Sequence, residues 1–167
     1  MMCVAQDINM LAGALVAELG RRSMTIATAE SCTGGAVSKA ITSVPGCSSV
    51  MRGAVVAYHN DVKAGVLGVA PAVLETVGAV SEEVVRQMVR GVSSLLSADC
   101  AIATSGIAGP GGGTPEKPIG TVWVAVKACE KVVAKRLQLV DSGRLQNVEN
   151  AVREALRMML ELLEGVA

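Results

Sequence analysis

The chain has 167 residues, the length of one ordinary domain. Hydrophobic residues make up 51% of it and charged residues 18%, a composition that indicates a folded globular protein and excludes intrinsic disorder. Its 15 Lys and Arg balance 15 Asp and Glu, and it contains one Trp, one Tyr, one His and no Phe. The positive field and stacking rings of a nucleic-acid-binding protein are therefore absent, and a histidine-based zinc site is excluded.

The cysteines, at positions 3, 32, 47, 100 and 129, are odd in number and form no CxxC pair. This spacing fits neither a disulfide framework nor a zinc ribbon. No basic segment followed by an apolar core opens the chain, and its longest uncharged stretch is interrupted by glycines and prolines. We therefore expect a cytoplasmic protein with reduced thiols, without a signal peptide and without contact with a membrane.

The first third of the chain predicts a helix, a strand and a second helix. Asp7 is a suitable N-cap for the first helix, which is expected to end at Gly20 in a left-handed turn. A short buried strand over 24–28 then leads into a turn of small residues over 29–35. A helix follows over about 36–43.

The middle of the chain continues the alternation. A β-branched run over 51–58 predicts a second strand, after which Asn60 is expected to cap a short helix that carries Lys63. Pro71 can begin another helix, and Ser81, followed by two glutamates, is a good start for the next one.

The last third predicts a hairpin and a long helix. A strand over 99–104 is followed by a segment over 105–121 that contains six glycines and three prolines, too long for a simple connector. Runs over 121–128 and 131–140 predict an antiparallel hairpin at the edge of the sheet. A helix over about 145–163 completes the pattern.

This order of elements predicts the α/β class: a single α/β/α layered domain over residues 1–167, with a mixed, largely parallel sheet and a C-terminal edge hairpin. Ligands of open α/β sheets bind beyond the carboxyl ends of strands. Small-residue clusters at 30–35, 58–63 and 104–113 are therefore expected to converge on one pocket. The edge hairpin and the aliphatic faces favour a homo-oligomer.

The turn Glu30-Ser31-Cys32-Thr33-Gly34-Gly35 is the first candidate for chemistry. Free N–H groups at a helix start can hold an anion or the oxyanion of a tetrahedral intermediate, which would make Ser31 a nucleophile. A simple capped helix start is the alternative interpretation. Cys32 is a rival nucleophile, although a buried free cysteine usually acts as a small apolar residue.

A nucleophilic serine needs a base, and the sequence offers two. His59 is the only imidazole, whereas Lys63 would lose proton affinity if a pocket desolvated it and could then deprotonate a hydroxyl. Tyr58 could relay a proton or orient the lysine. The alternatives are a solvated Lys63 and a packed Tyr58 ring.

The glycine-rich segment over 104–114 exposes many backbone amides and no large side chain. Such a segment suits a phosphate or a flat ligand held by the main chain, and a flexible lid or a structural crossing is the alternative. No acidic cluster has the spacing of metal ligands, so we expect no metal and no cofactor.

Several motifs in order resemble the CinA C-terminal domain family over about residues 7–163. They are Thr28-Ala29-Glu30-Ser31-Cys32-Thr33-Gly34-Gly35, Tyr58-His59-Asn60 with Lys63, Gly78-Ala79-Val80-Ser81, Ser105-Gly106-Ile107-Ala108-Gly109-Pro110 with Gly112-Gly113, and Lys117-Pro118-Ile119-Gly120-Thr121-Val122. The resemblance implies a nicotinamide-nucleotide amidohydrolase, which converts nicotinamide mononucleotide and water to nicotinic acid mononucleotide and ammonia in pyridine nucleotide recycling. The chain is similar to the stand-alone deamidase form of the family.

The resemblance also implies roles for single residues. Ser31 would be the nucleophile, Lys63 the base that takes its proton, and Tyr58 the third catalytic residue. The substrate would be a small-molecule nucleotide, with the oxyanion held by the turn and the ribose phosphate by the glycine-rich segment. The implied substrate-binding residues are Glu30, Thr33, Gly34, Thr104, Ser105, Gly106, Gly109, Gly112 and Arg144.

The sequence departs from the family pattern before the last helix. The family usually carries Gly-Asp-Arg and a second arginine four residues later, where this chain has Ser142-Gly143-Arg144 and Val148. Arg144 is retained as a phosphate or interface group. Two alternatives therefore stay open: an amidohydrolase that acts on a different small amide, and a catalytically silent nucleotide-binding module.

Overall fold

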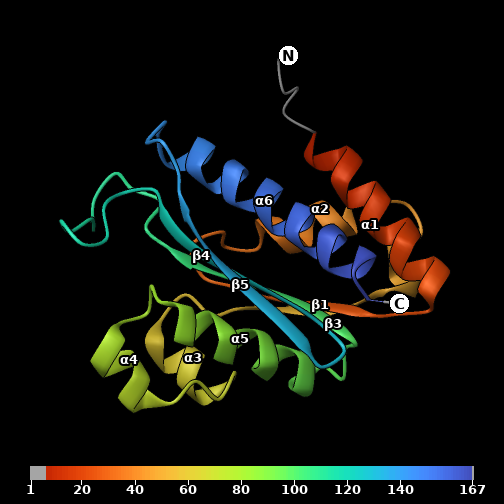
Figure 1. Ribbon diagram of the computed structural model, residues 1–167, viewed down its shortest axis with the longest axis horizontal. Helices are drawn as coiled ribbons and strands as arrows, with labels where there is room; N and C mark the ends of the chain where they lie inside the picture. The colour runs from red at the N-terminus through yellow and green to blue at the C-terminus, as the bar shows by residue number, and fades with distance from the viewer. Residues whose placement is uncertain (1–6, 167) are drawn as a thin grey trace.

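The computed structural model describes residues 7–166, so Cys3 lies outside the described residues. These residues form six α-helices, a short 3-10 helix and five strands (Figure 1). In chain order the elements are α1 (Ile8–Arg22), β1 (Ile26–Glu30), α2 (Ala36–Thr42), η1 (Cys47–Ser49), β2 (Met51–Val56), α3 (Asn60–Gly65), α4 (Pro71–Val77), α5 (Glu82–Leu95), β3 (Cys100–Gly106), β4 (Thr121–Ala128), β5 (Lys131–Gln138) and α6 (Arg144–Glu164).

The strands form one mixed sheet in the order β2-β1-β3-β4-β5. β1 pairs in parallel with β2 and β3, whereas β4 is antiparallel to both β3 and β5. Every strand except β4 therefore runs in the same direction, and the hairpin of β4 and β5 lies at the edge. Helices α1, α2 and α6 cover one face of the sheet and α3, α4 and α5 the other (Figure 1). The predicted layered α/β fold is confirmed.

The two faces of the sheet are buried under separate aliphatic cores. Successive residues of β3 point to opposite faces, so Ile102 packs under α1 and α6 while Ala101 and Ala103 face α5. The alanines leave room for the buried valines and Met88 of α5 to approach the sheet closely. No buried aromatic side chain contributes to either core within residues 7–166, in agreement with the composition.

The first helix extends past its predicted end. Asp7 caps α1 as expected, but Gly20 does not terminate it. The left-handed residue that ends the helix is Ser23, with φ 55°, and its N–H donates to the Gly20 carbonyl at 3.1 Å. Arg22 forms an ion pair with Glu18 one turn earlier, which favours the additional residues.

Other element boundaries also differ from the prediction, and two of them bear on the site. β1 runs over Ile26–Glu30 rather than 24–28, because its last residues remain paired with both neighbouring strands. Asn60 is the first residue of α3, and His59 is its cap. The imidazole Nδ1 accepts the N–H of Asp61 at 3.3 Å, since an unprotonated ring nitrogen can replace a capping oxygen.

The side chain that caps α2 comes from the end of β1. The N-cap residue of α2 is Gly35, with φ 101° and no side chain to offer, so the first N–H groups of the helix need another acceptor. The carboxylate of Glu30 accepts the N–H groups of Gly35, Val37 and Ser38 at 3.0, 3.0 and 2.8 Å. It also accepts the hydroxyl of Thr33 at 2.7 Å. This fully buried carboxylate fixes the turn between β1 and α2.

We expect Glu30→Gln to lower the free energy of unfolding by about 3 kcal/mol, because an amide in place of the carboxylate turns donor groups toward the N–H groups of α2. Urea denaturation followed by circular dichroism measures this loss. Glu75→Gln, at an exposed position of α4, is the matched control and should change stability by less than about 0.5 kcal/mol. Equal midpoints for the two variants would contradict the capping role of Glu30.

Candidate functional site

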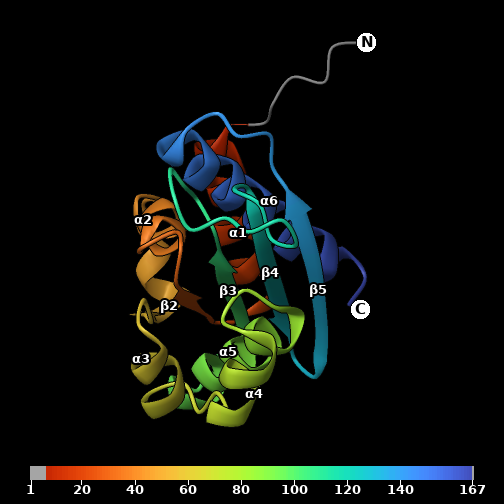
Figure 2. The same cartoon turned by 90° about the vertical axis from the view of Figure 1, so that its left-hand side faces the viewer.

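The carboxyl ends of the parallel strands β2, β1 and β3 lie next to one another at the turn that carries Ser31. The N–H of Ser31 donates to the Thr104 carbonyl at the end of β3, at 3.0 Å. On the other side, the N–H of Ala57 donates to the Glu30 carbonyl at 2.8 Å. The start of α2, the loop over 107–120 and the start of α6 lie at the same end of the sheet (Figure 2). The three clusters therefore lie at the same end of the sheet, as predicted, and that they line one pocket stays a prediction.

The Ser31 turn is tightly closed by its own backbone. The N–H of Gly34, at φ 58°, donates to the Ser31 carbonyl at 3.1 Å, and that of Ala36 donates to the Thr33 carbonyl at 3.0 Å. The expected role of the Gly34 amide toward an oxyanion is therefore not supported. Within residues 7–166, the backbone N–H groups of Cys32 and Thr33 are the ones in this turn without a backbone acceptor. They remain available to a ligand.

The prediction of an open anion site at the start of α2 is wrong. Glu30 already occupies the first N–H groups of the helix with a buried carboxylate. The same contacts give Glu30 and Thr33 a different role from the expected substrate binding. The hydroxyl of Thr33 donates to Glu30, so the 2.7 Å contact between the Thr33 and Thr104 hydroxyls is donated by Thr104. These buried hydrogen bonds, from Thr104 to Thr33 and from Thr33 to Glu30, hold the turn in place.

Cys32 is a poor competitor for the role of nucleophile. Its side chain is buried, and burial is the main cause that raises the pKa of its thiol to about 12. The Thr104 hydroxyl and the Arg144 charge oppose this shift only in part. The thiol is therefore protonated at neutral pH, whereas thiolate is the reactive form of cysteine. The choice of Ser31 as the nucleophile stays a prediction.

Lys63 is buried, with only 1% of its surface exposed. Its Nζ donates to the backbone carbonyl of Tyr58 at 3.0 Å, and among residues 7–166 it forms no ion pair with a carboxylate. Because burial disfavours the charged ammonium, the pKa of Lys63 is lowered from its ordinary value of 10.5. The alternative of a solvated lysine is wrong. In the described residues no hydrogen bond joins Nζ to the Ser31 hydroxyl.

Tyr58 connects the lysine to the last helix. Its backbone carbonyl holds Lys63, and its hydroxyl accepts a hydrogen bond from Nη2 of Arg144 at 3.0 Å. The residue is 60% exposed, so the ring is not a packed core group as the alternative proposed. Much of Tyr58 is therefore open to solvent, next to Ala57, whose N–H donates to the Glu30 carbonyl.

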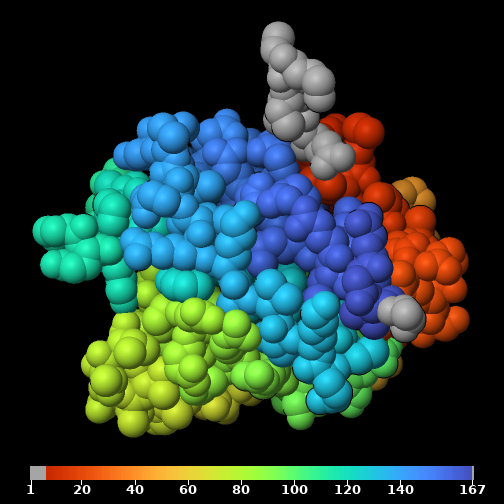
Figure 3. Space-filling model, in the orientation of Figure 1, coloured from red at the N-terminus to blue at the C-terminus, as the bar shows by residue number. Residues whose placement is uncertain are grey.

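Arg144 reaches the glycine-rich loop from the first turn of α6. Its Nη1 donates to the Gly109 carbonyl at 2.8 Å. Gly109 has φ 87°, and a Cβ there would lie 2.9 Å from the side chain of Ile119, so a larger residue would be strained. The loop projects from the surface (Figure 3), and its residues 110–116, Gly112 among them, are exposed. Within residues 7–166, the N–H groups of Ala108, Gly109 and 111–113 have no backbone acceptor.

Three residues at the end of β3, all expected to bind substrate, are used inside the protein. The Thr104 hydroxyl is committed to Thr33, and the Ser105 hydroxyl donates to the Ala79 carbonyl at 2.8 Å. A Cβ at Gly106 would lie 2.8 Å from the Thr121 carbonyl, so glycine is needed for the close approach of β4. These residues therefore shape the site through internal contacts, and their expected contact with a substrate stays a prediction.

Asn147 was missed from the sequence. It is fully buried in α6, where its amide donates to the Ala108 carbonyl at 3.0 Å. Ala151 and Ala155 follow it at intervals of four residues and are also buried. An amide at the first position of an apolar helix face is the signal that could have identified it.

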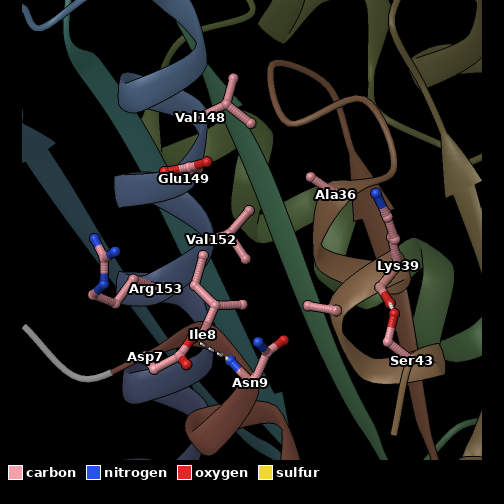
Figure 4. Close-up of a pocket in the computed structure, with 11 residues that line it drawn as sticks. Asp7, Ile8, Asn9, Ala36, Lys39, Ser43, Val148, Glu149, Val152 and Arg153 are labelled. Carbon is pink, nitrogen blue, oxygen red and sulfur yellow. Dashed lines mark hydrogen bonds between the residues drawn. The ribbon is translucent and has the colours of Figure 1, made fainter.

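A separate pocket of about 400 Å³ lies beside the site, between α2 and α6 and next to the start of α1 (Figure 4). Val148 and Val152 of α6 face Ala36 of α2 across it, and Lys39 stands at its rim. The pocket contains none of the predicted site residues.

Among residues 7–166 no helix combines the length and apolar character of a membrane span, and no three metal-ligating side chains gather at one place.

Comparisons with known proteins agree with this architecture. The CinA C-terminal domain family matches residues 8–163. CinA-like proteins of Synechococcus sp. (strain CC9902) and Amoebophilus asiaticus (strain 5a2) are 50% and 45% identical over 128 and 141 residues, which cover 77% and 84% of this chain but 30% and 34% of those proteins. The chain thus spans about a third of the length of these curated relatives.

Solved structures of similar proteins match almost the whole chain. A competence/damage inducible protein, CihA, from Agrobacterium tumefaciens is 39% identical, with a TM-score of 0.92 over 97% of this chain and 99% of that one. The competence damage-inducible protein A (ComA) from Klebsiella pneumoniae is 34% identical, with a TM-score of 0.93 over 97% and 100%. The chain therefore belongs to the CinA C-terminal domain family.

Proposed function

We propose that the protein hydrolyses the carboxamide of nicotinamide mononucleotide, forming nicotinic acid mononucleotide and ammonia. The observation that carries this proposal is the buried Lys63, which is held on the Tyr58 carbonyl and has no carboxylate partner among residues 7–166. Cys32, the residue after Ser31, lies close enough to Lys63 to influence its pKa. A lysine in such a setting is deprotonated more easily and can act as a general base.

In the first half of the reaction, the neutral amine of Lys63 takes the proton of the Ser31 hydroxyl as the oxygen attacks the carboxamide carbon. The carbonyl oxygen becomes an oxyanion, for which the N–H groups of Cys32 and Thr33 are the available donors in the turn. When the tetrahedral intermediate collapses, the C–N bond breaks and the Lys63 ammonium returns the proton to the departing ammonia. The product is an ester on Ser31.

In the second half of the reaction, water hydrolyses the ester on Ser31. Lys63 takes a proton from the water as its oxygen attacks the ester carbon, and the collapse of the second intermediate returns that proton to the Ser31 oxygen. The carboxylic acid product leaves and loses its own proton to solvent. Lysine and serine are restored, so the cycle needs no cofactor.

The features around the turn fit a mononucleotide with a positively charged pyridinium ring. The exposed face of Tyr58 suits such a ring, because an aromatic face attracts a cation. The guanidinium of Arg144 contacts both Tyr58 and the glycine-rich loop. This guanidinium and the free N–H groups of the loop suit the phosphate. The ligand would then lie across the Ser31 turn, between Tyr58 and the loop.

Ammonia release from nicotinamide mononucleotide tests the proposal, with nicotinamide and other small amides as competing substrates. We expect the wild-type protein to release ammonia from the nucleotide, and Ser31→Ala to lose at least about 10³-fold in kcat/KM because the nucleophile is gone. Cys32→Ala, one residue away, is the matched control and should retain most activity. Bound nucleotide without ammonia release would identify a silent binding module instead.

Lys63→Met keeps an unbranched side chain one atom shorter and removes the base. We expect kcat to fall by about 10²- to 10⁴-fold while the denaturation midpoint at neutral pH stays the same or rises, because the cost of burying an ammonium disappears. His59→Ala provides the contrast: it removes the cap of α3, which costs about 1 kcal/mol of stability, and keeps most of the activity. An inactive His59→Ala and an active Lys63→Met would reverse the assignment.

The pH dependence follows from the lowered pKa of Lys63. Since the neutral amine is the active form, kcat/KM should rise with pH and level off above a midpoint below 10.5. The folded state binds this proton less tightly than the unfolded chain, so the stability of the wild type relative to Lys63→Met should rise with pH from that midpoint up to about 10.5. Rates and denaturation midpoints measured from about pH 6 to about pH 10 test both trends. A rate that falls as pH rises would contradict a lysine base.

A further inference from the structure

Asn147 is a fully buried amide that the proposed reaction does not use. It lies in the first turn of α6, three residues after Arg144, on a helix face that continues with Ala151 and Ala155. A polar side chain is tolerated on such a face when its hydrogen bonds are made inside the protein. The partners of Asn147 therefore indicate what it holds in place.

Its amide joins three segments of the chain. Nδ2 donates to the Ala108 carbonyl of the glycine-rich loop at 3.0 Å, and to Oδ1 of Asp141, before α6, at 3.2 Å. Its own Oδ1 accepts the N–H of Ser142 at 3.4 Å. The Asp141 carboxylate in turn accepts the N–H of Gly143, the N-cap residue of α6, which has no side chain for capping. The loop, the segment over 141–143 and the start of α6 are thereby bound to one another.

Arg144 spans the same segments on the outside. Its guanidinium donates to the carbonyl of Gly109, the residue after Ala108, and to the Tyr58 hydroxyl. Arg144 is exposed. Hydrogen bonds of a long exposed side chain fix its position only weakly, because water competes for the same donors and the side chain loses rotamer freedom. Asn147, one helical turn away, is itself fully buried, and its bond to the Ala108 carbonyl is buried and thus shielded from that competition.

We propose that Asn147 is a positioning residue that holds Arg144 against the glycine-rich loop. The inference rests on the proposed function, in which Arg144 and this loop bind the phosphate of the substrate. Asn147 is buried and acts only through its neighbours. Its loss should therefore weaken binding of a phosphorylated substrate and leave the chemistry at Ser31 largely unchanged.

Steady-state kinetics of Asn147→Leu, Arg144→Ala and the double variant test this role. With nicotinamide mononucleotide, we expect each single variant to raise KM about tenfold with kcat within about threefold, and the double variant to be no worse than Arg144→Ala alone. With nicotinamide riboside, which carries the same amide without the phosphate, the KM of the variants should match that of wild type. Additive losses, or equal losses on both substrates, would overturn the proposal.

Controls separate positioning from a general loss of structure. Gln146→Leu removes an exposed amide from the same turn and should behave as wild type. If Asn147→Leu does not fold, Asn147→Asp keeps the acceptor for Ser142 and loses both donors, and the same kinetic pattern is expected of it.

Amide hydrogen exchange gives a result that does not depend on activity. In the Asn147 variant, exchange should become faster over both 107–113 and 140–146 than in wild type and in Gln146→Leu. Unchanged exchange in either segment would overturn the proposal. If the wild-type protein releases no ammonia from the nucleotide, the proposed function fails, and the exchange measurement alone decides whether Asn147 holds the loop to α6.

Discussion

The site depends on one buried carboxylate. Glu30 ends the central strand β1 and accepts hydrogen bonds from the first N–H groups of α2, which has a glycine where a capping side chain usually stands. An ionised acceptor at a helix N-terminus is stabilised by the helix dipole and by charge-assisted hydrogen bonds. The same carboxylate anchors Thr33 and, through it, Thr104 of the neighbouring strand. The turn that carries Ser31 is thus held by buried groups that no ligand needs to touch.

A second constraint is the burial of Lys63 close to this turn. The lysine has no carboxylate partner among residues 7–166 and donates to a main-chain carbonyl, so desolvation is not offset by an ion pair and favours the neutral amine. The carbonyl belongs to Tyr58, whose hydroxyl bonds to Arg144 of α6. Tyr58 therefore links the candidate base, Lys63, to the candidate phosphate-binding residue, Arg144, although these two residues are far apart in sequence.

The sequence predicted the order of elements, because hydrophobic periodicity, caps and glycines are local signals. Residue types and positions in the chain also identified Ser31, Tyr58 and Lys63 as candidates. Arg144 was identified through the family resemblance. It could not separate residues that face a ligand from residues that support them: Glu30 and Ser105 are polar and lie in the motifs, yet their bonds are made internally. The role of Asn147 depends on contacts with Ala108 and Asp141, and the first of these crosses between distant segments.

The central claim is that Ser31, and not the adjacent thiol of Cys32, forms the covalent intermediate. Acid-quenching the protein during turnover of nicotinamide mononucleotide, followed by peptide mass spectrometry, tests it most directly. We predict an acyl adduct, the substrate minus ammonia, on the peptide that contains both residues, with fragmentation placing it on Ser31 and with no adduct in Ser31→Ala. An adduct on Cys32, or turnover by Ser31→Ala at the wild-type rate, would contradict the account.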